Sequence, residues 1–151
     1  MSIAITLHLL GVIIWVGGMF FAHMVLRGAV GKMLEPRQRL QLMIKVFDGF
    51  FPWVWFSVLA ILTSGYWMLF VFNGMEIHFW LLFMSLVGTL MAVIFVFVYL
   101  LPYHQLGAAL KIHDIPKAVA SITLIRQLIL TNLILGLLVT LAAMFGKYGL
   151  I

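Results

Sequence analysis

Four long runs of apolar residues divide the sequence, at about residues 3–26, 50–72, 79–101 and 122–145. A helix needs about 20 such residues to cross the hydrocarbon core of a bilayer, so each run is long enough to span it. The runs are continuous rather than alternating, which favours helices over the strands of a barrel. The sequence therefore predicts a single all-α domain over residues 1–151, an integral membrane four-helix antiparallel bundle.

The connection between the first two runs, residues 27–48, is the most highly charged part of the chain. Pro36 favours the start of a helix there, because proline suits the first helical turn. The apolar residues that follow it fall on one face of such a helix. We therefore expect a short amphipathic helix on the membrane surface between the first two spans. Its apolar stripe consists of Leu40, Met43, Ile44 and Phe47.

The other connections carry simpler signals. Asn73-Gly74 predicts a tight turn between the second and third spans. Pro102 is expected to close the third span, since proline lacks the amide hydrogen that a helix interior uses. The second and third spans are thus expected to be antiparallel neighbours.

Composition supports a membrane protein. The 151 residues are 66% hydrophobic and 9% charged, whereas about a quarter of the residues in a soluble domain are charged. So little polar surface cannot cover a water-soluble globule, and the lipid bilayer is the expected partner. The sequence has no cysteine, which excludes disulfides, thiolate metal sites and a cysteine nucleophile. Any metal must be held by His, Met, carboxylate or backbone groups.

Basic residues gather on one side of the predicted membrane. Because positive residues stay cytoplasmic, we expect a multi-pass protein of the bacterial inner (plasma) membrane with periplasmic N- and C-termini. The basic residues flank apolar runs, so no nucleic acid partner is expected. Eight of the nine share one side, with only Lys147 opposite: Arg27, Lys32, Arg37, Arg39, Lys45, Lys111, Lys117 and Arg126.

His8 is the first candidate for chemistry, because an ionisable residue inside a span indicates function by default. Helical spacing places it on one stripe with Gly11, Trp15, Gly18 and Ala22. Small residues on a membrane helix mark where another helix or a flat cofactor comes close. We expect Trp15 and Gly18 to bind a cofactor together with His8. The alternative is a neutral histidine that is hydrogen-bonded across the bundle.

His78 is the second candidate, because it opens the third span from the same outer side as His8. If their two stripes face each other, both imidazoles can converge on one metal ion, and imidazole suits copper, iron and zinc. Met75 stands beside His78 and can assist a copper ion, since thioether suits Cu(I). Taken alone, His78 reads as an interfacial residue. Its stripe continues through Leu81, Ser85, Gly88 and Ala92.

Arg126 lies about one turn inside the cytoplasmic end of the fourth span. Its guanidinium can snorkel to the interface, or it can pair with Asp48 at the same side of the membrane. A third interpretation is a carboxylate clamp on a haem propionate or another anionic ligand. All three remain open, and Arg126 is included among the expected cofactor-binding residues.

The segment LHLLGVIIWVGGMFFAHMVLRGAV resembles the start of CopD-type membrane proteins. The segments FFPWVWFSVLAILTSGYWMLF and IRQLILTNLILGLLVTLAA are similar to later parts of that superfamily. The likeness covers most of the chain, and its most specific motif is His8 followed by Trp15-Val16-Gly17-Gly18. This resemblance implies copper uptake across the inner membrane beside a periplasmic copper carrier.

The related HemJ-type proteins are four-helix protoporphyrinogen oxidases that bind b-type haem, and this resemblance implies haem ligation by His8. Their third span carries a functional lysine near the position of Trp80, whereas this chain has no lysine in that span. The departure argues against protoporphyrinogen oxidation. It leaves haem binding open, with His78 as a second axial ligand.

Three functions follow as expectations. The first is copper transport or homeostasis through an outer-side metal site of His8, His78 and Met75. The second is a b-type haem redox protein, and the third is a non-catalytic accessory membrane subunit. Only four acidic residues are present and none form a catalytic pair, which argues against a hydrolase. Any enzyme would be a haem-dependent oxidoreductase, and a homodimer or a membrane partner protein would complete a path.

Overall fold

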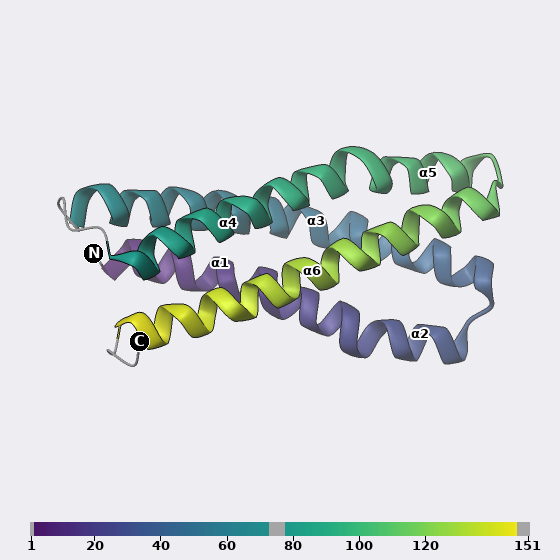
Figure 1. Ribbon diagram of the computed structural model, residues 1–151. Helices are drawn as coiled ribbons and strands as arrows, with labels where there is room; N and C mark the ends of the chain where they lie inside the picture. Colours follow the sequence, from purple (N-terminus) through teal and green to yellow (C-terminus); the bar gives the residue numbers. More distant parts are fainter. Residues whose placement is uncertain (1, 73–77, 148–151) are drawn as a thin grey trace.

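The computed structural model describes residues 2–72 and 78–147, and nearly all of them are helical. Four helical segments are long and apolar enough to cross a membrane (Figure 1). At about 1.5 Å of rise per residue, each exceeds the roughly 30 Å hydrocarbon core. The predicted all-α class and the four membrane-length helices are confirmed. The segments are Ser2–Met33, Pro36–Val71, Phe79–Lys111 and Ile115–Lys147.

Three of these segments contain a stretch of π-helix. The first consists of α1 (Ser2–Phe20), the π-helical η1 (Phe21–Leu26) and α2 (Arg27–Met33). The second consists of α3 (Pro36–Trp67) and η2 (Met68–Phe72). The third consists of α4 (Phe79–Val98), η3 (Tyr99–Tyr103) and α5 (His104–Lys111). The fourth is the unbroken α6 (Ile115–Lys147).

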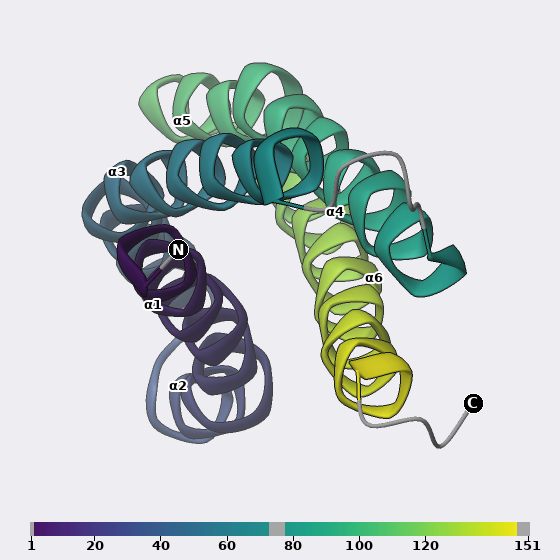
Figure 2. The same ribbon diagram turned by 90° about the vertical axis from the view of Figure 1, so that its left-hand side faces the viewer.

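Successive segments run in alternating directions, so the start of α1 and the end of α6 lie at one end of the molecule (Figure 1). Viewed from that end, α1–α2 and α6 form the two arms of an arc, with α3 and α4–α5 across its top (Figure 2). α1 packs mainly on α3, and α6 packs mainly on α4 and α5. The two arms meet where Gly136 of α6 lies against Val16 of α1.

The expected surface helix is not a separate element. Residues 36–49 form the first turns of α3, which continues without a break to Trp67. The apolar stripe faces the protein, because Leu40, Met43 and Phe47 are all buried in the core. Ile44 lies against Gly107 of α5. The stripe is therefore explained by packing between helices rather than by contact with a membrane surface.

Pro102 does not end the third helical segment. The helix passes through it as η3 and continues as α5 to Lys111. A π-helical turn shifts the pattern of backbone hydrogen bonds, so the helix can accommodate a proline, which has no amide hydrogen to donate. The prediction that Pro102 closes the span was wrong for this reason. The third helix is longer as a result, and α5 covers the N-terminal part of α6.

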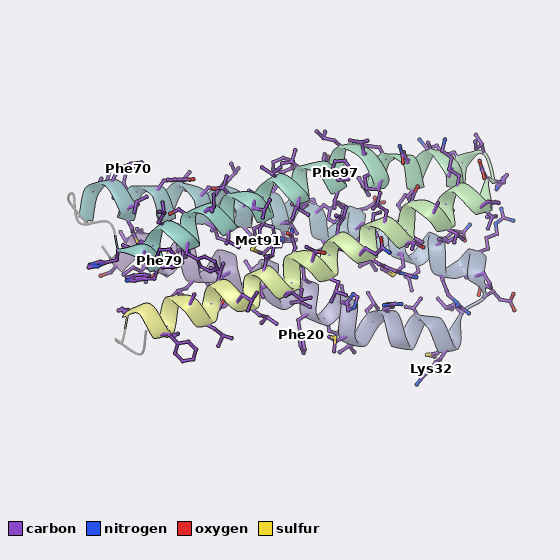
Figure 3. The ribbon with its side chains drawn as sticks, in the orientation of Figure 1. Phe20, Lys32, Phe70, Phe79, Met91 and Phe97 are labelled. Carbon is purple, nitrogen blue, oxygen red and sulfur yellow. The ribbon has the colours of Figure 1, made fainter. Side chains whose placement is uncertain are left out.

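Large apolar side chains cover the outside of the helices. Phe20, Phe70, Phe79 and Phe97 point away from the molecule, whereas Met91 points inward (Figure 3). Phe79 is 82% exposed and Met91 only 4%. An apolar outer surface of this extent suits lipid rather than water. The fold is that of a multi-pass membrane protein.

Candidate functional site: the cavity beside His8

His8 is held by a serine of the neighbouring helix. Its Nδ1 lies 3.1 Å from the Oγ of Ser64 in α3. The Ser64 hydroxyl already donates its only hydrogen to the carbonyl of Ala60. The imidazole must therefore be the donor to Ser64, which places the proton on Nδ1. The lone pair of Nε2 is left for a ligand, the arrangement that metal-binding histidines use.

Glycines allow α1 to approach α3 closely at this point. A Cβ on Gly65 would meet the His8 ring at 3.3 Å, so the missing side chain makes room for the imidazole. A Cβ on Gly11 would lie 2.8 Å from Ile61 and 3.1 Å from the carbonyl oxygen of Ser57. This agrees with the expectation that small residues of the His8 stripe mark a close helix contact. The partner is α3.

His8 opens onto a cavity of about 390 Å³ between α1, α3, α4 and α6. That volume lies within the range of roughly 300–1,000 Å³ that is usual for small-molecule and cofactor sites. Leu81, Ser85 and Gly88 of the predicted stripe on the third span also line it. The stripes of His8 and His78 therefore share one cavity, although His78 itself does not line it.

Four methionines contribute to the wall of this cavity. Met68 from η2, Met84 and Met91 from α4, and Met144 from α6 all contribute to its wall. Methionine commonly fills irregular gaps between helices, but here four of them line the same cavity as an imidazole. Thioether and imidazole together suit Cu(I).

The hydroxyl groups of the wall are already engaged. Ser85 donates to the carbonyl of Leu81, and Thr140 donates to the carbonyl of Gly136. The Tyr66 hydroxyl is hydrogen-bonded to Thr89 at 2.8 Å. The His8 imidazole and the thioethers are consequently the groups best placed to bind a ligand. Lys147 also lines the cavity, near the end of α6.

His78 lies outside the cavity at its terminal end. The residue precedes α4, its side chain is exposed, and its ring stacks on Trp80 at 6.4 Å between centroids. Trp80 lines the cavity and packs against Gly146 of α6. The tryptophan therefore stands between His78 and the interior. Met75 is outside the described residues.

The remaining predicted residues lie deeper or at the far end. Trp15 is 3% exposed, packs edge-on against Phe95, and borders both the His8 cavity and a second, smaller one. Gly18 lies against the ring of Phe50 and lines the smaller cavity. Arg126 lines neither cavity. The structure therefore brings Trp15 together with His8, and separates Gly18 and Arg126 from it.

Sequence reasoning missed Ser64 and Gly65, the residues that position His8. Ser64 is buried, as is Ser57 one heptad earlier. Two serines seven residues apart in an apolar helix place small polar groups on one face. This spacing in the sequence could have predicted which face of α3 packs against α1.

These features define a class of protein: a polytopic helical membrane protein with an apolar, methionine-rich cavity and one oriented imidazole. Comparisons with family models, with curated proteins and with solved structures find no match to this chain. Within residues 2–72 and 78–147, no three His, Asp or Glu side chains come together as a metal-binding group.

Proposed function

We propose that the protein is a membrane copper-handling protein that binds Cu(I) in the His8 cavity. One observation carries this proposal: a single cavity contains the oriented imidazole of His8 and is lined by four methionines. Cu(I) prefers such soft and borderline ligands, and it tolerates the low coordination numbers that an apolar site imposes. The resemblance of the His8 segment to CopD-type proteins supports the same assignment.

The distribution of basic residues supports a proposal for the side of the membrane on which the His8 cavity lies. Eight of the nine basic residues lie on α2, α5 and the N-terminal parts of α3 and α6, at the end of the molecule opposite His8 (Figure 1). The positive-inside rule supports a cytoplasmic position for that end. In this proposed orientation the start of α1, the end of α6 and the His8 cavity lie on the periplasmic side of an inner membrane. A periplasmic copper carrier is then the natural donor of the ion.

The test is a competition titration of Cu(I) against a chromogenic chelator with detergent-purified protein. The His8→Ala variant should bind Cu(I) at least about 100-fold more weakly, because a direct ligand counts for no less than the outer-shell groups that cost 10–100-fold. His104→Ala is the matched control, since His104 is exposed on α5. Equal Cu(I) affinity in the wild type and in His8→Ala would contradict the proposal.

A b-type haem is the second candidate, because the cavity has cofactor size and apolar walls. His8, through Nε2, and a cavity methionine would hold the haem iron, a pair of residue types that other haem proteins use. Bound haem would supply one-electron redox chemistry. Arg126 does not fit the role of a propionate partner in this cavity, because it lies outside the lining. Lys147 does line it.

An absorption spectrum distinguishes the two candidates. Protein produced with ample haem is measured oxidised and then dithionite-reduced, with His8→Ala beside it. A Soret band that shifts on reduction and weakens in the variant would favour haem over copper. A featureless spectrum together with His8-dependent Cu(I) binding would favour copper. Failure of both ligands would leave an accessory-subunit role to be tested by co-purification.

A further inference from the structure

The far end of the molecule has a surplus of positive charge that its own acidic residues do not neutralise. Glu35 caps α3 in a capping box with Gln38. Asp48 accepts a 2.6 Å hydrogen bond from the Tyr103 hydroxyl, and Asp114 accepts one from the backbone amide of Lys117. In the structure as described, each of these three carboxylates has a neutral partner. None of the three forms an ion pair with a neighbouring cation in this part of the chain.

Arg126 is the most deeply placed of these cations. Its Nε is buried without a hydrogen-bond partner in the described structure. The charges that act on it are those of Arg27, at the start of α2, and Arg39, near the start of α3. Arg126 and Arg27 in turn act on His23 of η1. Like charges repel one another, and a buried donor without a partner is costly.

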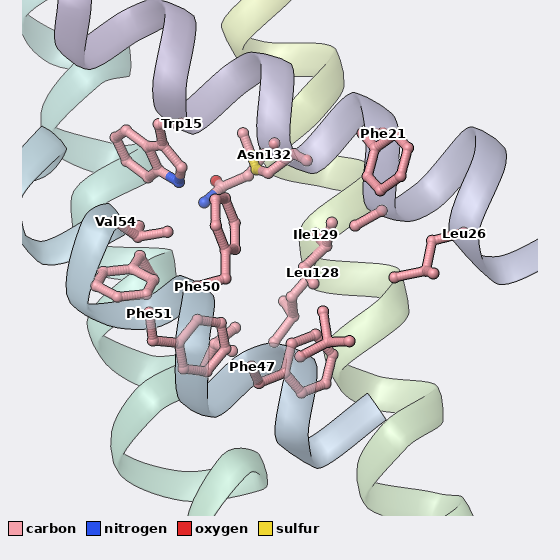
Figure 4. Close-up of a pocket in the computed structure, with 16 residues that line it drawn as sticks. Trp15, Phe21, Leu26, Phe47, Phe50, Phe51, Val54, Leu128, Ile129 and Asn132 are labelled. Atoms are coloured by element: carbon pink, nitrogen blue, oxygen red, sulfur yellow. The ribbon is translucent and has the colours of Figure 1, made fainter. Parts of the chain in front are cut away.

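A small apolar cavity lies beside these cations. It has a volume of about 140 Å³ and is lined by residues of α1, η1, α3, α4 and α6 (Figure 4). Leu26 lines it and is followed by Arg27, and Ile129 lines it one turn after Arg126. Ala22 and Phe50 also belong to its wall. Two arginines thus lie within one helical turn, along the chain, of residues that line an apolar cavity.

We propose that an anionic phospholipid of the cytoplasmic leaflet binds here, with its phosphate at Arg126, Arg27 and Arg39 and part of one acyl chain in the cavity. Charge complementarity selects the head group, because basic pockets between membrane helices bind anionic lipid head groups. The apolar cavity favours a lipid over a soluble phosphate, which has nothing to place there. The choice of leaflet rests on the orientation proposed above, but the proposal does not depend on what the His8 cavity binds.

The local backbone is consistent with such a site. The first and last long helices diverge toward this end (Figure 1). η1 is π-helical over Phe21–Leu26, and π-helical turns are frequent at functional sites because they re-aim side chains. Here η1 forms part of the apolar wall, and Arg27 directly follows it.

The test is native mass spectrometry of delipidated protein with phosphatidylglycerol and phosphatidylcholine of the same acyl chains. Wild type should retain phosphatidylglycerol preferentially. Arg126→Gln should weaken its retention about fivefold, and adding Arg27→Gln about fivefold again, given the usual contribution of one basic residue. Phosphatidylcholine should be unaffected. Lys32→Gln is the matched control, because Lys32 is exposed on α2 (Figure 3).

A second arm tests the acyl chain. Ala22→Phe fills the cavity without changing charge, so it should weaken phosphatidylglycerol retention while inorganic phosphate competition stays unchanged. Arg126→Lys keeps the charge and should keep most of the lipid preference, which guards against loss of the fold. Equal retention of both lipids by the wild type would overturn the proposal. So would inorganic phosphate displacing lipid at low millimolar concentration with no effect of Ala22→Phe, which would identify a soluble anion site.

Discussion

The two cavities of this protein differ in almost everything except their shared wall, Trp15. The cavity toward the termini is large, contains an oriented imidazole and is lined by methionines. The cavity toward the basic end is about 140 Å³, and its lining includes one strongly polar side chain, Asn132. Among the described residues no lysine or arginine lines the second cavity, although Arg27 directly follows its wall residue Leu26, whereas Lys147 lines the first.

This difference shows how one short chain can divide two tasks. The imidazole and thioethers of the first cavity are lone-pair donors, which suit a soft cation. The arginines proposed to hold a lipid phosphate next to the second cavity are hydrogen-bond donors, which suit an oxyanion. Because the two sites lie on opposite sides of a buried tryptophan, each can be altered separately.

The largest effect on stability is expected from removing the indole of Trp15, which separates the two cavities. Trp15→Ala should join the two cavities and lower the free energy of unfolding by about 2–4 kcal/mol. The van der Waals contacts with Phe95 are lost and not replaced, and in a membrane such packing contacts, rather than the hydrophobic effect, hold helices together. Thermal unfolding in detergent measures this loss. Trp53→Ala is the control, because Trp53 is 58% exposed on α3 and should change stability by less than about 1 kcal/mol. Equal losses would show that Trp15 is not a structural divider.

Adjacent glycines offer a second test. A Cβ at Gly18 would lie 2.2 Å from the ring of Phe50, whereas one at Gly17 would meet no atom within 4 Å. Gly18→Leu should therefore force α1 and α3 apart at a cost of roughly 1–3 kcal/mol, as overpacking does. Gly17→Leu should be nearly neutral. The measurement is again thermal unfolding, and similar melting temperatures for the two variants would contradict the close helix contact.

A pair of serines separates support of His8 from support of the fold. Ser64 and Ser57 are both buried in α3, and both donate to the carbonyl four residues earlier. Only Ser64 also accepts from His8. Ser64→Ala should weaken Cu(I) binding roughly 10–100-fold, the usual effect of removing an outer-shell partner of a metal-binding histidine. Ser57→Ala should leave affinity unchanged. If both variants bind Cu(I) like the wild type, Ser64 does not orient the imidazole.

The apolar runs predicted the helices because hydrophobic length is a strong local signal for a membrane segment. Local signals misled where long-range packing decides the outcome. The stripe that includes Leu40 and Phe47 looks like a membrane-surface helix, but it is buried against other helices of the same chain. Pro102 looks like a helix end, but η3 carries the helix past it. Neither contact is visible in sequence spacing.

The candidate site was predicted only in part, again because sequence spacing reports local helix faces and not the packing between helices. Helical spacing identified His8 and Trp15 as one stripe, and both line the large cavity. Spacing could not say that Ser64 of α3 would hold the imidazole, because rotation of one helix against another is set by packing. It also could not show that Trp80, rather than His78, faces inward.

The smallest expected change in stability comes from replacing Asn132, and whether the change is a gain or a loss is informative. Asn132 is 3% exposed, and its Nδ2 donates to the carbonyl of Met91 at 3.1 Å, while its Oδ1 has no partner in the described structure. In Figure 4 its carboxamide and the indole of Trp15 both face the small cavity. Replacing Asn132 by Leu removes a hydrogen bond worth about 0.6 kcal/mol between membrane helices. It also removes an unsatisfied acceptor that costs about 1–3 kcal/mol.

The second term is larger, so Asn132→Leu should unfold at the same temperature as the wild type or a few degrees higher. Thr131→Leu is the control, because Thr131 is exposed and bonds to its own helix. Phosphatidylglycerol retention should persist in Asn132→Leu, since the acyl chain needs only an apolar wall. A clear loss of stability would mean instead that Oδ1 is satisfied by a bound polar molecule. The small cavity would then hold water or a polar ligand, and the contrast between the two cavities would weaken.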